Sequence, residues 1–195
     1  MYPVNQYMVI IKPGERVKNR MRRIRETWKQ QYDLMSGQMQ GGFVLLSRFW
    51  QYRHLEQKVL DRLQLIAMDA APFKVHLKDY AMLPQESIGL QIENPAGIYN
   101  IVKKMQRDPR LFKTPQHHPY FNLQPQALWL ANKLQPQQFD QIAATFRKRH
   151  FTADFIADSL LVLRKAGNDS KWLVAAEYPL QNLAVFSEQG VLFAA

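Results

Sequence analysis

The feature that most constrains the fold of this chain is the order of its β-prone and helix-prone segments. Short runs rich in β-branched and aromatic residues alternate with stretches whose apolar residues recur at helical spacing. The order is strand, helix, strand, helix, strand, strand, helix, strand, helix, strand, strand. The same type of unit occurs in each half, without a literal sequence repeat. This order predicts an α+β fold with two pseudo-symmetric halves, each an antiparallel sheet with helices packed on its outer face.

The segments can be placed on the sequence. Strands are expected at residues 6–12, 43–50, 73–78, 87–93, 127–131, 151–165 and 171–178. Helices are expected at 13–32, 55–68 and 96–108 and from Pro136 onwards. A long loop is predicted for the Pro-rich residues 108–126, a hairpin turn for 166–170 and a last small hairpin for 185–193. We expect a single bilobal domain over residues 1–195, with one lobe formed by about 1–50 and 135–180 and the other by 51–134.

Composition excludes several classes of function. The chain has no cysteine among its 195 residues, which excludes disulfide frameworks, cysteine-ligated zinc, iron–sulfur clusters and thiol catalysis. It has no glycine-rich phosphate loop, Ser/His/Asp set or zinc-ligand spacing, so neither a cofactor nor a metal site is expected. Its apolar runs are far shorter than the ~18 residues that cross a bilayer, and its first residues do not resemble a signal peptide. We therefore expect a cytoplasmic protein that does not insert into a membrane.

Positive charge is concentrated in one segment. The formal net charge is +10, and the residues from Lys12 to Lys29 supply +6 of it. In this segment the apolar residues recur at steps of four, three and four: Val17, Met21, Ile24 and Trp28. This spacing predicts an amphipathic helix with a basic outer face. That face is either simply solvated or contacts an anion such as RNA or phospholipid, with Arg22, Arg23 and Arg25 as the candidate contacts. Aromatic residues are not interleaved with the cations, so base stacking on this face is not expected.

Several local segments, in this order along the chain, carry a resemblance to a known family. They are Phe49-Trp50-Gln51-Tyr52, Ile66-Ala67-Met68, Pro72 to Asp79, Leu130 to Phe139, and His150 to Asp158. From about Tyr7 to Leu180 the chain resembles the two-histidine phosphoesterases, which include RNA 2′,5′-ligase-like proteins and cyclic phosphodiesterases. The resemblance implies two lobes, each supplying a His-x-Thr/Ser-x motif from a central strand, with the two motifs facing each other across a cleft.

The positions of both motifs are occupied by other residue types in this sequence. The first His and Thr/Ser positions fall on Phe43 and Leu45, and the second pair falls on Ala127 and Trp129. A rival register would place the second motif on residues 120–123 (Tyr-Phe-Asn-Leu), but it leaves the following Leu-x-Pro-x-x-Phe pattern out of place. Neither register has a histidine at a motif position, so we interpret both motifs as degenerate.

The absence of histidine from both motif positions bears directly on catalysis. Opening a cyclic phosphodiester in line needs one group to take a proton from water and a second to donate one to the leaving oxygen. Phenylalanine, leucine and alanine do neither, and Trp129 offers one N–H without a titratable group. We therefore expect a catalytically inactive binding or interaction module whose cleft has an apolar floor and a basic rim. The resemblance implies RNA or a nucleotide as the ligand, and Arg48 and Lys133, which flank the two motifs, are candidate anion contacts.

Two alternatives remain open. The first is an active 2′,3′-cyclic phosphodiesterase or RNA 2′,5′-ligase-like enzyme whose rearranged site uses His117 or His118 together with Tyr120, Arg48 and Lys133. The second is a structural subunit whose cleft is filled by its own side chains or by a protein partner.

Overall fold

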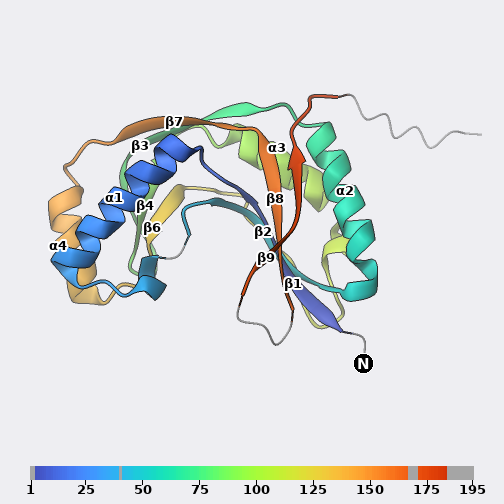
Figure 1. Ribbon diagram of the computed structural model, residues 1–195, viewed down its shortest axis with the longest axis horizontal. Helices are drawn as coiled ribbons and strands as arrows, with labels where there is room; N and C mark the ends of the chain where they lie inside the picture. Colours follow the sequence, from blue (N-terminus) through green and yellow to red (C-terminus); the bar gives the residue numbers. More distant parts are fainter. Residues whose placement is uncertain (1–2, 40, 167–170, 184–195) are drawn as a thin grey trace, which may run out of the picture.

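The computed structural model describes residues 3–39, 41–166 and 171–183. Its strands form two antiparallel sheets that together make an arch, with the helices on the outside (Figure 1). The first sheet has the strand order β5-β2-β1-β8-β9, and the second has the order β6-β4-β3-β7. The bilobal α+β architecture with helices outside two antiparallel sheets is confirmed.

The bounds of the elements are as follows. The strands of the first sheet are β1 (Val4–Ile11), β2 (Val44–Tyr52), β5 (Tyr120–Phe121), β8 (Ser159–Ala166) and β9 (Leu173–Pro179). The strands of the second sheet are β3 (Phe73–Leu83), β4 (Ser87–Ile92), β6 (Ala127–Ala131) and β7 (Thr152–Ala157). The α-helices are α1 (Glu15–Tyr32), α2 (Glu56–Met68), α3 (Ala96–Gln106) and α4 (Pro136–Phe146). Three short 3-10 helices are η1 (Ser36–Met39), η2 (Arg53–Leu55) and η3 (Pro109–Phe112).

Two helices cross from the sheet that precedes them to the other sheet. Helix α1 follows β1 of the first sheet but packs beside β6, β7 and α4. Helix α3 follows β4 of the second sheet but packs beside β2 and α2. The units β1-α1-β2 and β4-α3-β6 therefore have the same arrangement. In each unit the helix packs on the sheet of the other lobe and so links the two lobes.

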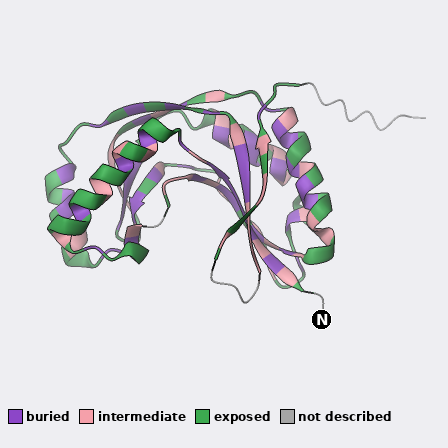
Figure 2. Ribbon diagram, viewed as in Figure 1, coloured by how far each residue is buried: buried purple, intermediate pink, exposed green. Residues whose placement is uncertain are grey.

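Helix α1 forms where the periodicity predicts it. It begins after Pro13 and the N-cap Gly14, and it ends at Asp33, which has the left-handed φ of 50° typical of a helix C-terminus. Three residues of its apolar stripe are buried and Ile24 is partly buried. Trp28 is fully inaccessible and meets Phe146 of α4 edge to face at 5.0 Å. Figure 2 shows the same division for the other helices, whose buried residues face the sheets and whose exposed residues face outwards. This apolar packing fixes the orientation of the basic face of α1.

The structure divides residues 151–165 differently from the sequence-based prediction of one long strand. Strand β7 ends at Ala157 and pairs with β3 in the second sheet, whereas β8 begins at Ser159 and pairs with β1 in the first. Residues 152–157 pair in the second sheet, and α4 packs beside β4 of that sheet. Burial alternates strictly along β7 but is continuous from Leu160 to Val162 in β8. The change in burial pattern coincides with the point where the chain passes from the second sheet to the first. Strand periodicity alone, however, does not identify the sheet in which a strand pairs.

Other segments also differ from or lie outside the prediction. The stretch 108–126, predicted as a loop, contains η3 and the short edge strand β5. Strands β8 and β9 pair as an antiparallel hairpin, although its turn at 167–170 and the predicted hairpin at 185–193 lie outside the described residues. Within the described ranges, no helix combines the length and apolarity needed to cross a membrane.

Candidate functional site

The two motif segments predicted from the sequence meet where β2 and β6 approach each other. A Cβ placed on Gly41, just before β2, would lie 3.7 Å from the Cβ of Trp129 on β6. Phe43, Leu45 and Ala127 are half-buried, and 47% of the Trp129 surface is exposed. The structure therefore brings the two segments together and leaves the Trp129 indole facing solvent rather than the core.

Arg25 joins these two segments through backbone carbonyls. Its Nε donates to the Leu130 oxygen at 2.9 Å, its Nη2 donates to the Trp129 oxygen at 2.8 Å, and its Nη1 donates to the Gly41 oxygen at 3.5 Å. Burial lowers the pKa of the Arg25 guanidinium below its ordinary value. Arg25 was predicted as a contact on the basic face, but its donors are used to position the strands.

The loop next to Arg25 depends on two glycines. Gly41 and Gly42 have φ of 106° and 95°, in the left-handed region that favours glycine. At Gly42 a Cβ would also come within 3.1 Å of the Arg25 Nη1. The glycine-rich connector thus lets the chain turn tightly around the guanidinium and enter β2 beside β6.

The face of the first sheet opposite α2 and α3 carries a small apolar cluster separate from the main core. Met8, Ile10 and Leu161 are almost fully buried there. They are covered by partly buried side chains, which are Phe43, Leu45, Leu163 and Trp172. Both positions of the first motif thus belong to an apolar surface, as the sequence-based interpretation expects for the floor of the cleft.

A cavity of about 430 Å³ lies between this surface and α1. Its apolar lining comes from Ile10, Met21, Met39 and Phe43. Its basic lining comes from Lys12, Lys18, Arg22, Arg25 and Lys29, and Glu26 is the one acidic residue among the described residues that line it. We call this cavity the basic pocket. Four of its cations, at positions 18, 22, 25 and 29, repeat at steps of four, three and four and lie one residue beyond each apolar position of α1.

The cations of the basic pocket differ in how far they are already neutralised. Lys18 pairs with Glu15 at 2.7 Å, and Lys12 pairs with Glu177 at 3.4 Å. Within the described parts of the chain, no carboxylate lies within ion-pair distance of Arg22 or Lys29. Because both residues are exposed and their charges are not neutralised by a carboxylate, these two are best placed to attract an anion.

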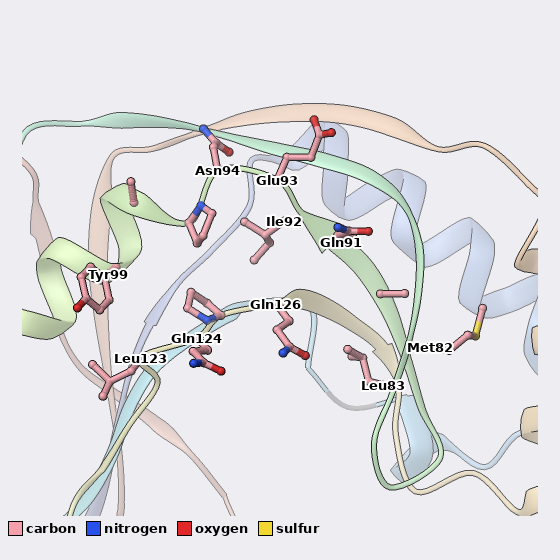
Figure 3. A pocket seen from close by; sticks show the side chains of 14 residues that line it. Met82, Leu83, Gln91, Ile92, Glu93, Asn94, Tyr99, Leu123, Gln124 and Gln126 are labelled. Atoms are coloured by element: carbon pink, nitrogen blue, oxygen red, sulfur yellow. The ribbon is translucent and has the colours of Figure 1, made fainter.

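A second cavity of about 890 Å³ occupies the related position in the other unit (Figure 3). It lies between the end of β4, the start of α3 and the residues before β6, as the basic pocket lies between β1, α1 and the residues before β2. Gln124 and Gln126 line one side, and Glu93 and Asn94 line another (Figure 3). None of the described residues that line it is Lys, Arg or His. This cavity therefore lacks the charges that bind phosphate.

The remaining candidates lie in two places. Arg48 pairs in register with Tyr120 of β5, and His117 stacks on Trp50 at 5.0 Å, so these residues lie along the β5-β2 edge of the first sheet. His118 is exposed near them in the chain, with no role that the structure assigns. Lys133 is exposed at the end of β6 with φ 51° and lines neither cavity.

His117 does not approach the degenerate motif. Trp50, on which it stacks, lies on β2 seven residues beyond Phe43, which corresponds to roughly 20 Å at about 3.3 Å per strand residue. Its Nδ1 lies 3.0 Å from the Thr114 Oγ1. His117 could therefore act only in a site distinct from the meeting point of β2 and β6.

The two registers considered for the second motif fall on different sheets. Ala127 and Trp129 lie on β6 of the second sheet, the strand that approaches β2 across the two lobes. Residues 120–121 form β5, which pairs with β2 itself at the edge of the first sheet. Two facing motifs need one strand from each sheet, so the geometry favours the Ala127 register.

The sequence analysis did not single out some of the residues that line the basic pocket. Lys18 and Lys29 belong to the predicted basic helix but were not singled out, and Met39 lies in the unpredicted η1. The step pattern of the cations beside the apolar stripe is the signal that could have selected Lys18 and Lys29 over Arg23. Arg23 is exposed and lines neither cavity. Among the described residues, no group of three His, Cys, Asp or Glu could hold a metal ion.

Comparisons with known proteins identify the fold. No protein-family model and no curated protein matches the chain. The structure of E. coli LigT complexed with 3′-AMP matches with a TM-score of 0.57 and 10% identity, over 91% of this chain and 98% of that one. TT0787 of Thermus thermophilus matches with a TM-score of 0.58 and 11% identity, over 90% and 98%. Other matching LigT structures are complexed with ATP and with NADP+. The chain therefore has the fold of the two-histidine phosphoesterase superfamily.

Proposed function

We propose that this protein is a catalytically inactive two-histidine phosphoesterase-like module that binds a nucleotide or RNA in the basic pocket. The observation that carries the proposal is the pairing of two features at one place. The motif positions Phe43, Leu45, Ala127 and Trp129 carry no proton-transfer group, and the cation-lined cavity opens directly beside Phe43. The cavity is therefore equipped to hold an anion, whereas the motif positions are not equipped to transfer protons.

The missing chemistry can be stated in terms of the reaction. Each general acid or base contributes about 10²- to 10⁴-fold to a rate, so loss of both brings turnover close to the uncatalysed reaction. The nearest polar groups, on Arg25, are occupied by the backbone carbonyls of Leu130 and Trp129. An arginine does not exchange protons near neutral pH. Among the described residues, no histidine lines the pocket beside Phe43, and Glu26 is its one carboxylate.

The binding chemistry follows from the lining of the pocket. Arg22 and Lys29 supply charge and N–H donors for phosphate oxygens, and Lys18 adds a third cation. Phe43, with its neighbours Ile10 and Met39, offers an apolar surface to a base or ribose. LigT structures complexed with 3′-AMP, ATP and NADP+ support a nucleotide as the class of ligand.

The experiment measures binding of 3′-AMP by isothermal titration calorimetry at low salt. We expect the Arg22→Ala/Lys29→Ala variant to weaken binding by about tenfold or more, because a charge-assisted hydrogen bond contributes about 1.5–3 kcal/mol. Arg16→Ala/Arg23→Ala is the matched control, since it also removes two positive charges from the same helix, at exposed residues that do not line the pocket. Equal losses of 3′-AMP affinity in both variants would show that binding depends on the net charge of the chain rather than on the pocket. Absence of binding to the unmodified chain would contradict the proposal and favour a structural subunit.

The alternative of an active enzyme is tested by a hydrolysis assay. Hydrolysis of 2′,3′-cyclic AMP that persists in Arg22→Ala/Lys29→Ala but disappears in His117→Ala/His118→Ala would indicate an active site near Trp50 and would contradict an inactive protein. We expect no hydrolysis above the protein-free rate in any of these variants.

A further inference from the structure

A second surface on the first sheet combines aromatic rings with an unpaired cation. Strand register places consecutive rows of side chains on the face opposite α2 and α3. One row contains Leu161, Ile10 and Leu45, and the next contains Leu163, Met8, Arg48 and Tyr120. The following row contains Lys165, Gln6 and Trp50. The face therefore changes from apolar beside the basic pocket to aromatic and basic farther along β2.

The aromatic rings on this face are held in place and accessible. Trp50 stacks on His117 with an interplanar angle of 27°, and the His117 Nδ1 contacts the Thr114 Oγ1 at 3.0 Å. Tyr120 is anchored by its strand, because its carbonyl accepts the Ser47 hydroxyl at 2.8 Å, while 53% of the Tyr120 surface is exposed. We call Arg48, Trp50, His117 and Tyr120 the β2 platform.

The charge of this face is positive. Arg48 is exposed and has no ion-pair partner within the described ranges, and Lys165 lies over the Trp172 ring at 5.5 Å. The acidic residue of β9 on the same side, Glu177, pairs with Lys12. Rings spaced with cations along one track are the combination that binds single strands, because bases stack on the rings and cations contact the phosphates.

We infer that the β2 platform binds the bases of a single-stranded RNA whose terminal nucleotide occupies the basic pocket, an inference that rests on the proposed function. The span from Phe43 to Trp50 is roughly 20 Å, which corresponds to about six stacked nucleotides at about 3.4 Å each. An oligonucleotide is thus the ligand that reaches both surfaces, whereas a mononucleotide reaches only the pocket.

The test compares these two ligands on the full chain. Fluorescence anisotropy with 5′-fluorescein hexaadenylate RNA reports both surfaces, and calorimetry with 3′-AMP reports the pocket alone. We expect Arg48→Gln/Tyr120→Ala to weaken hexaadenylate binding by about tenfold or more, the effect of removing one stacking ring and one cation. The Kd for 3′-AMP should stay within about twofold. Lys148→Gln, an exposed cation that follows α4 on the other lobe, is the matched control.

Arg48→Gln alone provides a readout that a change in folding would not give. Each phosphate contact to a single strand contributes about 0.7 to the slope of log K against log salt concentration, so this variant should lower the slope by about 0.7 for hexaadenylate. The slope for 3′-AMP should not change.

The results distinguish failure of the β2 platform from failure of the proposed function. Unchanged hexaadenylate affinity in Arg48→Gln/Tyr120→Ala, with 3′-AMP binding intact, would overturn the platform and leave the proposed function standing. A hexanucleotide that binds no more tightly than 3′-AMP would also overturn it and leave this face to a protein partner. Tight hexaadenylate binding that depends on the platform, without any 3′-AMP binding, would support the platform and contradict the pocket. No binding of either probe would contradict both.

Discussion

At the scale of single residues, Asp79 shows how the second sheet joins its strands. It lies in the irregularity of β3 with φ 57°, and its carboxylate accepts the backbone N–H of Phe151 at 3.0 Å and contacts the His150 Nδ1 at 3.2 Å. The hydrogen bond from Phe151, followed by the interactions with His150, lowers the pKa of Asp79 below its ordinary value. The carboxylate thereby fixes the start of β7.

This lowered pKa predicts a pH dependence of stability. A carboxylate whose pKa is lower in the folded chain stabilises the fold above its unfolded value of about 3.9, and this contribution is lost as the pH falls through the folded value. We expect Asp79→Asn to reduce the free energy of unfolding at about pH 7 and to differ less from the unmodified chain at about pH 3. Urea unfolding at both pH values measures this. A difference that is equal at the two pH values would contradict an electrostatic role for Asp79.

Residue-level prediction of the site rests on positions where side-chain type decides the chemistry. The sequence predicts that Phe43 and Trp129 are non-catalytic, which stays a prediction, and the structure places both where β2 and β6 approach each other. It also selected Arg22, which lines the basic pocket, and Arg25, which proves to hold backbone carbonyls. The stacking of His117 on Trp50 and the pairing of Tyr120 with Arg48 could not be predicted, because a Pro-rich segment without periodicity brings His117 and Tyr120 to β2.

At the scale of elements, most helices and strands were predictable because each buries one face. The strand at 127–131 and the helix starting at Pro136 have the predicted bounds. Prediction failed between β7 and β8, since a single residue, Asp158, separates strands that pair in different sheets. Pairing partners depend on long-range packing that local pattern does not encode.

The start of α3 gives a prediction that sets helix propensity against packing. Replacing a helical glycine with alanine normally stabilises by about 0.5–1 kcal/mol. At Gly97, however, a Cβ would come within 2.4 Å of the Phe73 ring. We expect Gly97→Ala to lower the free energy of unfolding by about 1–3 kcal/mol, the usual cost of overpacking.

Gly14 provides the control for that prediction. A Cβ there meets nothing within 4 Å, and the residue is the N-cap of α1. Gly14→Ser should change the free energy of unfolding by only a few tenths of a kcal/mol, in the stabilising direction. Chemical denaturation of both variants measures the difference. A stabilised Gly97→Ala variant would show that Phe73 moves aside without cost.

At the scale of the whole molecule, the two related units place equivalent cavities on either side of the motif strands. The cavity of β1-α1-β2 is lined by cations, and that of β4-α3-β6 is lined by glutamines and one glutamate. The fold alone therefore does not select the ligand site. In the proposed function, the excess charge of α1 does so, because it concentrates a large share of the net charge of +10 at one cavity.

The most direct test of this account is phosphorus NMR of 2′,3′-cyclic AMP mixed with a stoichiometric amount of the protein. The account predicts that the cyclic phosphate resonance shifts or broadens as the nucleotide binds, while its integrated intensity stays equal to that of a protein-free sample. Growth of a 2′- or 3′-phosphomonoester resonance above the protein-free rate would contradict it, because it would show that the chain retains proton-transfer groups able to open the ring.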